Sequence, residues 1–211
     1  MLIVISGMPG SGKSTLARAL ANALHLPLLS RDEIYSGLYL TSSDQHSLPS
    51  ALTSEMASDL ASDLAQPANT ALRLGAHSLL SAGVSVIIEA AFQQKLWSVV
   101  LEFLLPLAET RVIRCVIDPA IALQRMIQRL DQFPEQRAAH GDAQYISERV
   151  GKVTPLAVFD PVSLDVPTID VETTDGYRPS LDTVVSFVTT QRFGANRGRG
   201  HVDLADTGTS N

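Results

Sequence analysis

Short apolar runs alternate with amphipathic stretches along most of this chain. Between the runs, apolar residues recur every three or four positions, which is the spacing of one face of a helix. Strands that alternate with helices form a parallel sheet covered by helices on both faces. The pattern therefore predicts an α/β fold of three layers around a central parallel sheet of five strands. The expected strands are 2–6, 26–30, 84–90, 111–117 and 166–171.

The amphipathic stretches predict helices bounded by proline and glycine. Pro67 is expected to begin a separate helix, because proline is tolerated in the first turn of a helix but not in its interior. Gly83 is expected to stop that helix, and a polar turn is expected at 31–33, directly after the second strand. The expected helices are 13–24, 51–65, 67–82, 95–108, 120–130, 143–150 and 179–191.

Composition places most of the chain in one domain. The chain has 211 residues, of which 45% are hydrophobic, so a single domain over 1–190 can bury a substantial core. Residues 191–211 are rich in Gly, Asn, Arg, Asp and Thr and show no apolar periodicity, which predicts a disordered tail. The formal net charge of −6 provides no basic field for nucleic acid, although a local arginine cluster could still bind it.

The sequence shows no sign of a targeting or membrane segment. No apolar stretch approaches the ~20 residues of a membrane-spanning helix, and Met1 leads directly into the first strand without a basic leader. Cys115 is the single cysteine and cannot form an internal disulfide. Its apolar neighbours favour a buried strand residue over a reactive thiol. These features predict a cytoplasmic protein.

A phosphate-binding loop follows the first expected strand. Residues 7–15 read Gly-Met-Pro-Gly-Ser-Gly-Lys-Ser-Thr, the P-loop pattern, and lie between a strand and a helix. The glycines let backbone N–H groups surround an anion, and the helix N-terminus adds partial positive charge. Lys13 is expected to reach the β- and γ-phosphates, and the Ser14 hydroxyl to hold Mg²⁺. The pattern therefore predicts ATP and Mg²⁺ as cofactors, with binding residues Gly7, Pro9, Gly10, Ser11, Gly12, Lys13, Ser14 and Thr15.

Other motifs separate a kinase from the remaining P-loop classes. The chain has no Asn-Lys-x-Asp motif for guanine and no Leu-Ser-Gly-Gly-Gln transporter signature. The apolar strand that ends in Glu89-Ala90 lacks the Asp-Glu pair usual in AAA and helicase ATPases. Instead, an acidic residue follows the second strand, and two arginines lie one helical turn apart late in the chain. This arrangement suits phosphoryl transfer to an acceptor.

Asp32 is the candidate general base. The carboxyl ends of parallel strands open onto one crevice, where ligands of such sheets bind, so Asp32 is expected across that crevice from the P-loop. There its carboxylate can accept the proton of an acceptor hydroxyl, or orient that hydroxyl toward the γ-phosphorus. The alternative is a structural role as N-cap of a helix that starts near Glu33. Glu33 itself is expected to support the N-terminus of that helix.

Arg125 and Arg129 are candidate transition-state cations. Their i, i+4 spacing places them on one helix face, while Ile127 is expected to pack inward. Arginines that close from a lid can stabilise negative charge on the transferring oxygens. We expect this lid over about 119–142, with Arg137 as a further lid residue. The alternative for each arginine is a surface ion pair.

Four segments carry a family resemblance: 7–16 (GMPGSGKSTL), 30–33 (SRDE), 83–92 (GVSVIIEAAF) and 118–129 (DPAIALQRMIQR). In this order, the chain resembles the P-loop kinases related to polynucleotide kinase, zeta toxin and chloramphenicol phosphotransferase, often described as AAA-like ATP-binding kinases. The resemblance covers most of the chain. It implies Lys13 and Ser14 on phosphate and Mg²⁺, and Asp32 as the base that serves the acceptor. It also implies Arg125 and Arg129 as lid cations.

Two positions depart from the family pattern. In polynucleotide kinases an arginine commonly follows the acidic pair by a few positions and grips acceptor phosphate, whereas Tyr35 stands near that place here. The strand that carries Glu89 usually ends in Asp, and the longer Glu side chain shifts the carboxylate. Glu89 is a candidate for a Mg²⁺-bound water or the acceptor hydroxyl, with packing or an ion pair at a strand end as the alternative.

The sequence therefore predicts an ATP-dependent kinase that phosphorylates a hydroxyl of a small molecule. Tyr35 in place of arginine, together with the acidic composition, favours a small acceptor over a nucleic-acid 5′-end. A polynucleotide or tRNA-associated kinase is the alternative enzyme. An ATP-dependent binding module, or a toxin-like kinase with a protein partner, is the other alternative. The helices over 51–82 are expected to form one wall of the acceptor site, and the turn 173–176 is expected, by family position, to contact adenine.

Overall fold

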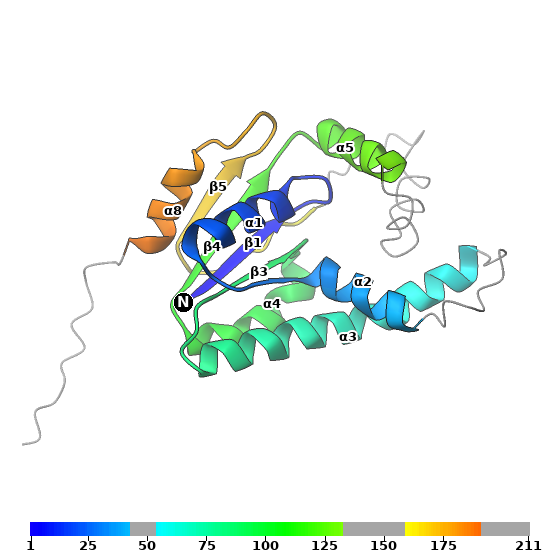
Figure 1. The fold of residues 1–211 in the computed structure, drawn as a ribbon, viewed down its shortest axis with the longest axis horizontal. Coiled ribbons are helices and arrows are strands. Elements are labelled where there is room, and N and C mark those ends of the chain that lie inside the picture. The colour runs from blue at the N-terminus through cyan, green and yellow to red at the C-terminus, as the bar shows by residue number, and fades with distance from the viewer. Residues whose placement is uncertain (43–53, 133–158, 191–211) are drawn as a thin grey trace, which may run out of the picture.

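The computed structural model describes residues 1–42, 54–132 and 159–190. Five parallel strands form one sheet in the order β2-β3-β1-β4-β5, with β1 in the centre (Figure 1). The central strands β1 and β3 are rich in Val, Ile and Leu and buried throughout, as expected for strands covered on both faces. The predicted parallel five-stranded sheet is confirmed. Its strands are β1 (Leu2–Gly7), β2 (Leu28–Ser30), β3 (Val86–Ala90), β4 (Thr110–Val116) and β5 (Thr168–Glu172).

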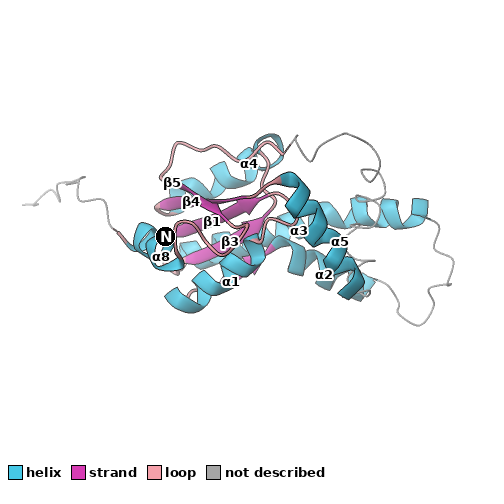
Figure 2. Cartoon of the chain, turned by 90° about the horizontal axis from the view of Figure 1, so that it is seen from above, coloured by secondary structure: helices cyan, strands magenta, loops and turns pink. Residues whose placement is uncertain are grey.

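Helices cover both faces of the sheet, which gives the predicted three layers (Figure 2). Alternate residues of β1 point to opposite faces, so Leu2 and Val4 join one core cluster and Ile3 and Ile5 the other. The first cluster includes α3 (Ser54–Ser81) and α4 (Gln94–Leu104), and the second includes α1 (Lys13–Leu24) and α8 (Leu181–Thr189). The remaining helices are α2 (Arg31–Ser42), η1 (Leu105–Leu107) and α5 (Pro119–Gln132).

The predicted break at Pro67 is wrong, because α3 runs without interruption from Ser54 to Ser81. Proline removes one backbone hydrogen bond and crowds the preceding turn, but this helix has a long packing surface beyond that point. Ala68 is fully buried against Tyr35 and Tyr39 of α2, and further residues of α3 enter the sheet core. Tertiary packing therefore outweighs the local cost of the proline.

The predicted polar turn at 31–33 is also wrong, because these residues form the first turn of α2. Asp32 therefore lies inside the helix, so the alternative in which it serves as N-cap is excluded. Its carboxylate, like that of Glu33, complements the positive end of the helix dipole. The predicted helix over 143–150 and the tail over 191–211 lie outside the described residues. Within the described ranges, no helix is long and apolar enough to cross a membrane.

Candidate active site

The P-loop connects the end of β1 to the start of α1. Gly10 and Gly12 adopt left-handed backbone angles, with φ of +80° and +78°, a conformation that glycine reaches without steric cost. A Cβ at Gly10 would collide with the backbone carbonyl of Ala122 in α5. A Cβ at Gly7 would approach the backbone carbonyl of Cys115 to 2.9 Å. The loop glycines therefore provide both the turn geometry and the close packing of the loop against α5 and β4.

Lys13 is the first residue of α1, and its side chain lies between two carboxylates. Its Nζ is 3.6 Å from Oε1 of Glu89 and 4.0 Å from Oδ2 of Asp32. Only 7% of the lysine side chain is exposed. Strand order explains the arrangement, because β3 lies between β1 and β2 and its end carries Glu89. The structure thus brings three predicted site residues together from three separate segments.

Glu89 is fully buried, which requires compensation for its charge. Oε2 accepts a hydrogen bond of 2.8 Å from the Ser30 hydroxyl. The two residues lie opposite each other because Ser30 of β2 pairs with Glu89 of β3. Within the described part of the chain, Oε1 has no hydrogen-bond donor and faces only the Lys13 ammonium group. A buried carboxylate oxygen with spare accepting capacity beside a P-loop lysine suits a hydrated Mg²⁺ ion.

The residues present also fit a bound nucleotide. The Ser11 hydroxyl is fully buried and lacks a hydrogen-bond partner among the described residues, so it can bond to a phosphate oxygen. Ser14 is partly exposed in the first turn of α1, where its hydroxyl can reach a metal ion. Pro9 and Thr15 are the remaining predicted loop residues, and they lie on either side of these groups.

Asp32 lies between two cations. Oδ2 faces Lys13 at 4.0 Å, and Oδ1 is 3.4 Å from Nη1 of Arg31. Its side chain is 36% exposed. Lys13 and Arg31 therefore place positive charge on both sides of this carboxylate.

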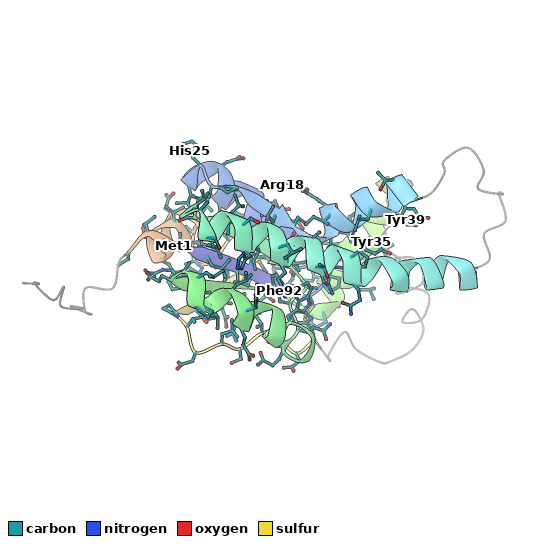
Figure 3. The ribbon with its side chains drawn as sticks, turned by 90° about the horizontal axis from the view of Figure 1, so that it is seen from below. Met1, Arg18, His25, Tyr35, Tyr39 and Phe92 are labelled. Carbon is teal, nitrogen blue, oxygen red and sulfur yellow. The ribbon has the colours of Figure 1, made fainter. Side chains whose placement is uncertain are left out.

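Tyr35, a candidate acceptor-site residue, is buried, with only 5% of its surface exposed. It packs in the second turn of α2 against Tyr39 and Ala68, and the two tyrosines lie close together where α2 runs along α3 (Figure 3). Burial raises the pKa of Tyr35 above its ordinary value and outweighs the opposite effect of Arg31. The Arg31 guanidinium lies over the Tyr35 ring, 4.9 Å from its centroid.

Arg125 contacts the loop that follows β5 and lies beside the P-loop. Its Nη2 donates to the backbone carbonyls of Thr173 and Thr174, at 2.9 and 2.7 Å. Its Nη1 would be 3.7 Å from a Cβ built on Gly12. The Thr173 hydroxyl in turn donates to the carbonyl of Ser11 at 2.7 Å. The turn expected to contact adenine is therefore connected directly to the phosphate-binding loop.

Arg129 is exposed, one helical turn further along α5. The two arginines therefore share a helix face but not an environment. Ile127, expected to pack inward, is 39% exposed, whereas Ala122 and Met126 form the buried side of α5. The buried face of α5 therefore carries Ala122 and Met126, and not Ile127 as predicted. Arg137 and the lid beyond Gln132 lie outside the described residues.

Sequence reasoning missed three residues of the site, namely Ser30, Arg31 and Asn69. Ser30 and Arg31 stand in a segment that carries the family resemblance, but neither pattern nor spacing indicated a contact with Glu89 or Tyr35. Asn69 accepts a hydrogen bond of 3.3 Å from Nε of Arg31, across the α2–α3 contact. Nothing in the sequence around Asn69 indicated this contact.

Comparison with solved structures supports a kinase fold. A Chloroflexus aurantiacus protein provisionally described as a kinase is 25% identical, with a TM-score of 0.66 over 89% of this chain and 95% of that chain. A sugar kinase from a Janibacter species is 19% identical, with a TM-score of 0.57 over 89% and 93%. Kti12 from Chaetomium thermophilum, solved with ADP-AlF3, is 20% identical, with a TM-score of 0.52 over 90% and 100%. No curated protein matches this chain significantly.

The family comparison covers the P-loop, Asp32, Glu89 and both arginines of α5. Residues 2–147, more than half of the chain, match the family described as an AAA domain, AAA_33. Together with the sheet order and the 25% identical neighbour that is provisionally described as a kinase, this match confirms the resemblance to P-loop kinases. The chain therefore belongs to the AAA_33 family and has the fold of a nucleotide-dependent P-loop kinase.

Proposed function

We propose that this protein is an ATP-dependent phosphotransferase that moves the γ-phosphate to a hydroxyl of a small-molecule acceptor. One observation carries the proposal: Oδ2 of Asp32 lies 4.0 Å from Nζ of Lys13, the P-loop lysine. A lysine in this position binds the β- and γ-phosphates. A carboxylate this close can therefore receive a proton from a hydroxyl that attacks the γ-phosphorus.

The proposed step transfers the γ-phosphoryl group directly from ATP to the acceptor hydroxyl. The acceptor oxygen forms a bond to the γ-phosphorus while the bond from that phosphorus to the β,γ-bridging oxygen breaks, and ADP leaves. The hydroxyl proton passes to a carboxylate oxygen of Asp32. Lys13 shifts its ammonium contact from the two carboxylates toward the phosphate oxygens, whose negative charge it stabilises.

Ser14 and Glu89 would hold Mg²⁺, Ser14 through its hydroxyl and Glu89 through the Oε1 atom or a bridging water. When bound, the ion would neutralise charge on the β- and γ-phosphates. Arg125 lies beside Gly12 and would add positive charge near the nucleotide. We assign Arg129 and Arg137 to the lid, where each can stabilise charge that develops during transfer.

A small acceptor is favoured over a polynucleotide by charge. The chain carries a net charge of −6, and polynucleotide binding draws most of its affinity from cations on phosphates. Tyr35 is buried beneath Arg31 and offers no charge to a nucleic-acid end. The Janibacter relative shares this fold and is described as a sugar kinase, which agrees with a small acceptor.

The test is transfer of label from γ-labelled ATP in the presence of Mg²⁺. The full-length protein is incubated separately with a fractionated metabolite pool and with oligonucleotides that carry free 5′-hydroxyls. Label on a small hydroxyl compound supports the proposal, whereas label only on oligonucleotide supports a polynucleotide kinase. Binding of ATP without transfer to any acceptor would contradict both and favour an ATP-dependent binding module.

A further inference from the structure

Arg31 occupies a position that works against the stability of its own helix. It is the first residue of α2, where the helix dipole is positive and repels a cation. Its side chain is only 22% exposed, although a charged group is most easily accommodated in full contact with water. Departures of this kind from local rules are concentrated at functional sites. Its contacts show how the guanidinium is oriented.

Two neighbouring side chains orient the Arg31 guanidinium, one at its face and one at an edge. Its face lies over the Tyr35 ring, 4.9 Å from the centroid, and that ring is itself buried against Tyr39 and Ala68. Its Nε donates to Oδ1 of Asn69 at 3.3 Å. Arg31 is therefore oriented by both α2 and α3 before any ligand arrives, which reduces the entropy lost on binding.

In the part of the chain that the structure describes, the opposite edge of the guanidinium has spare capacity to donate hydrogen bonds. Nη1 makes one contact of 3.4 Å, to Oδ1 of Asp32. Among the described residues, Nη2 has no hydrogen-bond acceptor. The two Nη groups of arginine form a planar fork that matches the two oxygens of a carboxylate or phosphate. The available edge can therefore bind an oxyanion.

The location of this edge points to the acceptor rather than the nucleotide. Arg31 and Lys13 contact different oxygens of the Asp32 carboxylate. Lys13 belongs to the P-loop, whereas Arg31 lies outside it. The proposed base, Asp32, therefore lies between the lysine that would bind the nucleotide and a second cation, Arg31. An anionic acceptor would otherwise be repelled by Asp32 and Glu89, and Arg31 offsets that repulsion.

Resting on the proposed function, we propose that Arg31 binds an oxyanion of the acceptor, so that the substrate is a small hydroxyl compound with a carboxylate or phosphate group. A hydroxyl bonded to Asp32 and an oxyanion bonded to Arg31 lie within about 10 Å of each other, given ordinary hydrogen-bond lengths. This separation corresponds to a few carbon atoms. Arg31 then determines specificity by selecting acids or phosphate esters over neutral polyols.

The experiment measures acceptor binding apart from phosphate transfer. Full-length protein is saturated with Mg²⁺ and a non-hydrolysable ATP analogue, which occupies the P-loop, and is titrated by calorimetry. The probes are polyols of three to six carbons and their acid and phosphate-ester counterparts, beginning with glycerol, glycerate and glycerol 3-phosphate. The acid and ester arms distinguish a carboxylate from a phosphate.

Wild type is compared with Arg31→Gln and with Arg73→Gln as a matched control. Arg73 also stacks over an aromatic ring, that of Phe103 at 4.9 Å, but on the α3–α4 surface. We expect Arg31→Gln to weaken binding of the preferred oxyanion at least about tenfold, which is the usual loss for a charge-assisted hydrogen bond. Arg73→Gln should bind as wild type does, and neutral polyols should not distinguish the variants. Thermal melting checks that Arg31→Gln is folded, and Arg31→Lys, which keeps the charge without the fork, should lie between the two.

Three results would overturn the proposal. Wild type and Arg31→Gln could bind every oxyanion probe equally, or wild type could bind only neutral polyols. In transfer assays, Arg31→Gln could lower kcat equally for neutral and anionic acceptors without changing KM, which would mean that Arg31 acts only through Asp32. If oxyanion binding depends on Arg31 but no phosphate is ever transferred, the oxyanion site stands and the proposed kinase activity fails.

Discussion

Lys13 and Glu89 form a buried ion pair, with Nζ 3.6 Å from Oε1 and the glutamate fully removed from solvent. The glutamate is also bound by Ser30, but its Oε1 atom receives no hydrogen bond from the described residues. The pair therefore compensates charge while it leaves one oxygen with accepting capacity beside the phosphate-binding loop. Substitution of Glu89 therefore tests directly whether this oxygen helps to hold a metal ion.

Replacing Glu89 with Gln should separate nucleotide affinity from its dependence on Mg²⁺. The amide removes a negative charge near the triphosphate, so binding of ATP without Mg²⁺ should be as tight as in wild type or tighter. The increase in affinity that Mg²⁺ confers should fall at least about tenfold, because a carboxylate ligand is lost. Calorimetric titrations with and without Mg²⁺ check this, with Glu102→Gln on the exposed side of α4 as control. An unchanged Mg²⁺ effect would exclude Glu89 from the metal site.

Replacing Asp32 with Asn should remove catalysis and preserve ATP binding. Loss of a general base lowers kcat by about 10²–10⁴-fold. ATP affinity should stay equal or rise, since one negative charge near Lys13 disappears. Single-turnover transfer and equilibrium ATP titration provide the two readouts, and Asp165→Asn, at an exposed position, is the control. Transfer at the wild-type rate would show that Asp32 is not the base.

Gly10→Ala should destabilise the protein more than Gly83→Ala does. Both glycines have positive φ angles, +80° and +77°, so both substitutions carry the strain of a left-handed residue, about 1–2 kcal/mol. A Cβ at Gly83 meets no atom within 4 Å, whereas one at Gly10 collides with the Ala122 carbonyl. We expect at least about 2 kcal/mol of additional loss for Gly10→Ala and a weaker affinity for ATP. Urea unfolding of both variants measures the difference, and equal losses would contradict the packing of α5 on the loop.

Cys115 should react slowly with thiol reagents. Burial in β4 raises the pKa of its thiol to about 12, since the charged thiolate is disfavoured away from water. At pH 8 the thiolate fraction is then about a thousandfold below that of an ordinary thiol. Ellman's reagent should label the native protein at least that much more slowly than the urea-unfolded chain. Fast labelling of the native protein would show that the thiol is exposed.

The raised pKa of the Cys115 thiol also makes the stability of the folded protein depend on pH. Above about pH 9 the unfolded chain releases the thiol proton, while the folded chain retains it up to about pH 12. The unfolded state then binds fewer protons, so the contribution of Cys115 to stability falls as the pH rises through this window. Cys115→Ala should therefore lose less stability than wild type between pH 9 and 11, and identical slopes would contradict the raised pKa.

The sheet could be predicted because its central strands, β1 and β3, are buried throughout and read as nearly continuous apolar runs. The P-loop could also be predicted, since its residues are consecutive and their spacing alone encodes the turn. The approach of Asp32 to Lys13 was predicted from the general property that parallel strands end at one edge. These are local patterns or general properties of the fold.

The contacts of Arg31, Glu89 and Arg125 could not be predicted, because each depends on the register or packing of distant segments. Ser30 meets Glu89 only because β2 pairs with β3 in one particular register. The guanidinium of Arg31 reaches Asn69 because α3 packs along α2, with Ala68 buried against Tyr35 and Tyr39. The packing of these two helices depends on residues far apart in the sequence, so spacing within either helix could not indicate it.

The hydrogen bond between Thr173 and Ser11 joins positions 162 residues apart and has a consequence for where this protein can be divided. The family match ends at residue 147, before β5 and the loop that contacts Arg125. A fragment trimmed to that match would keep every P-loop residue and yet lose the fifth strand and the backbone carbonyls that orient this arginine. The nucleotide site is thus a property of the entire sheet, and its last component is provided by the final third of the chain.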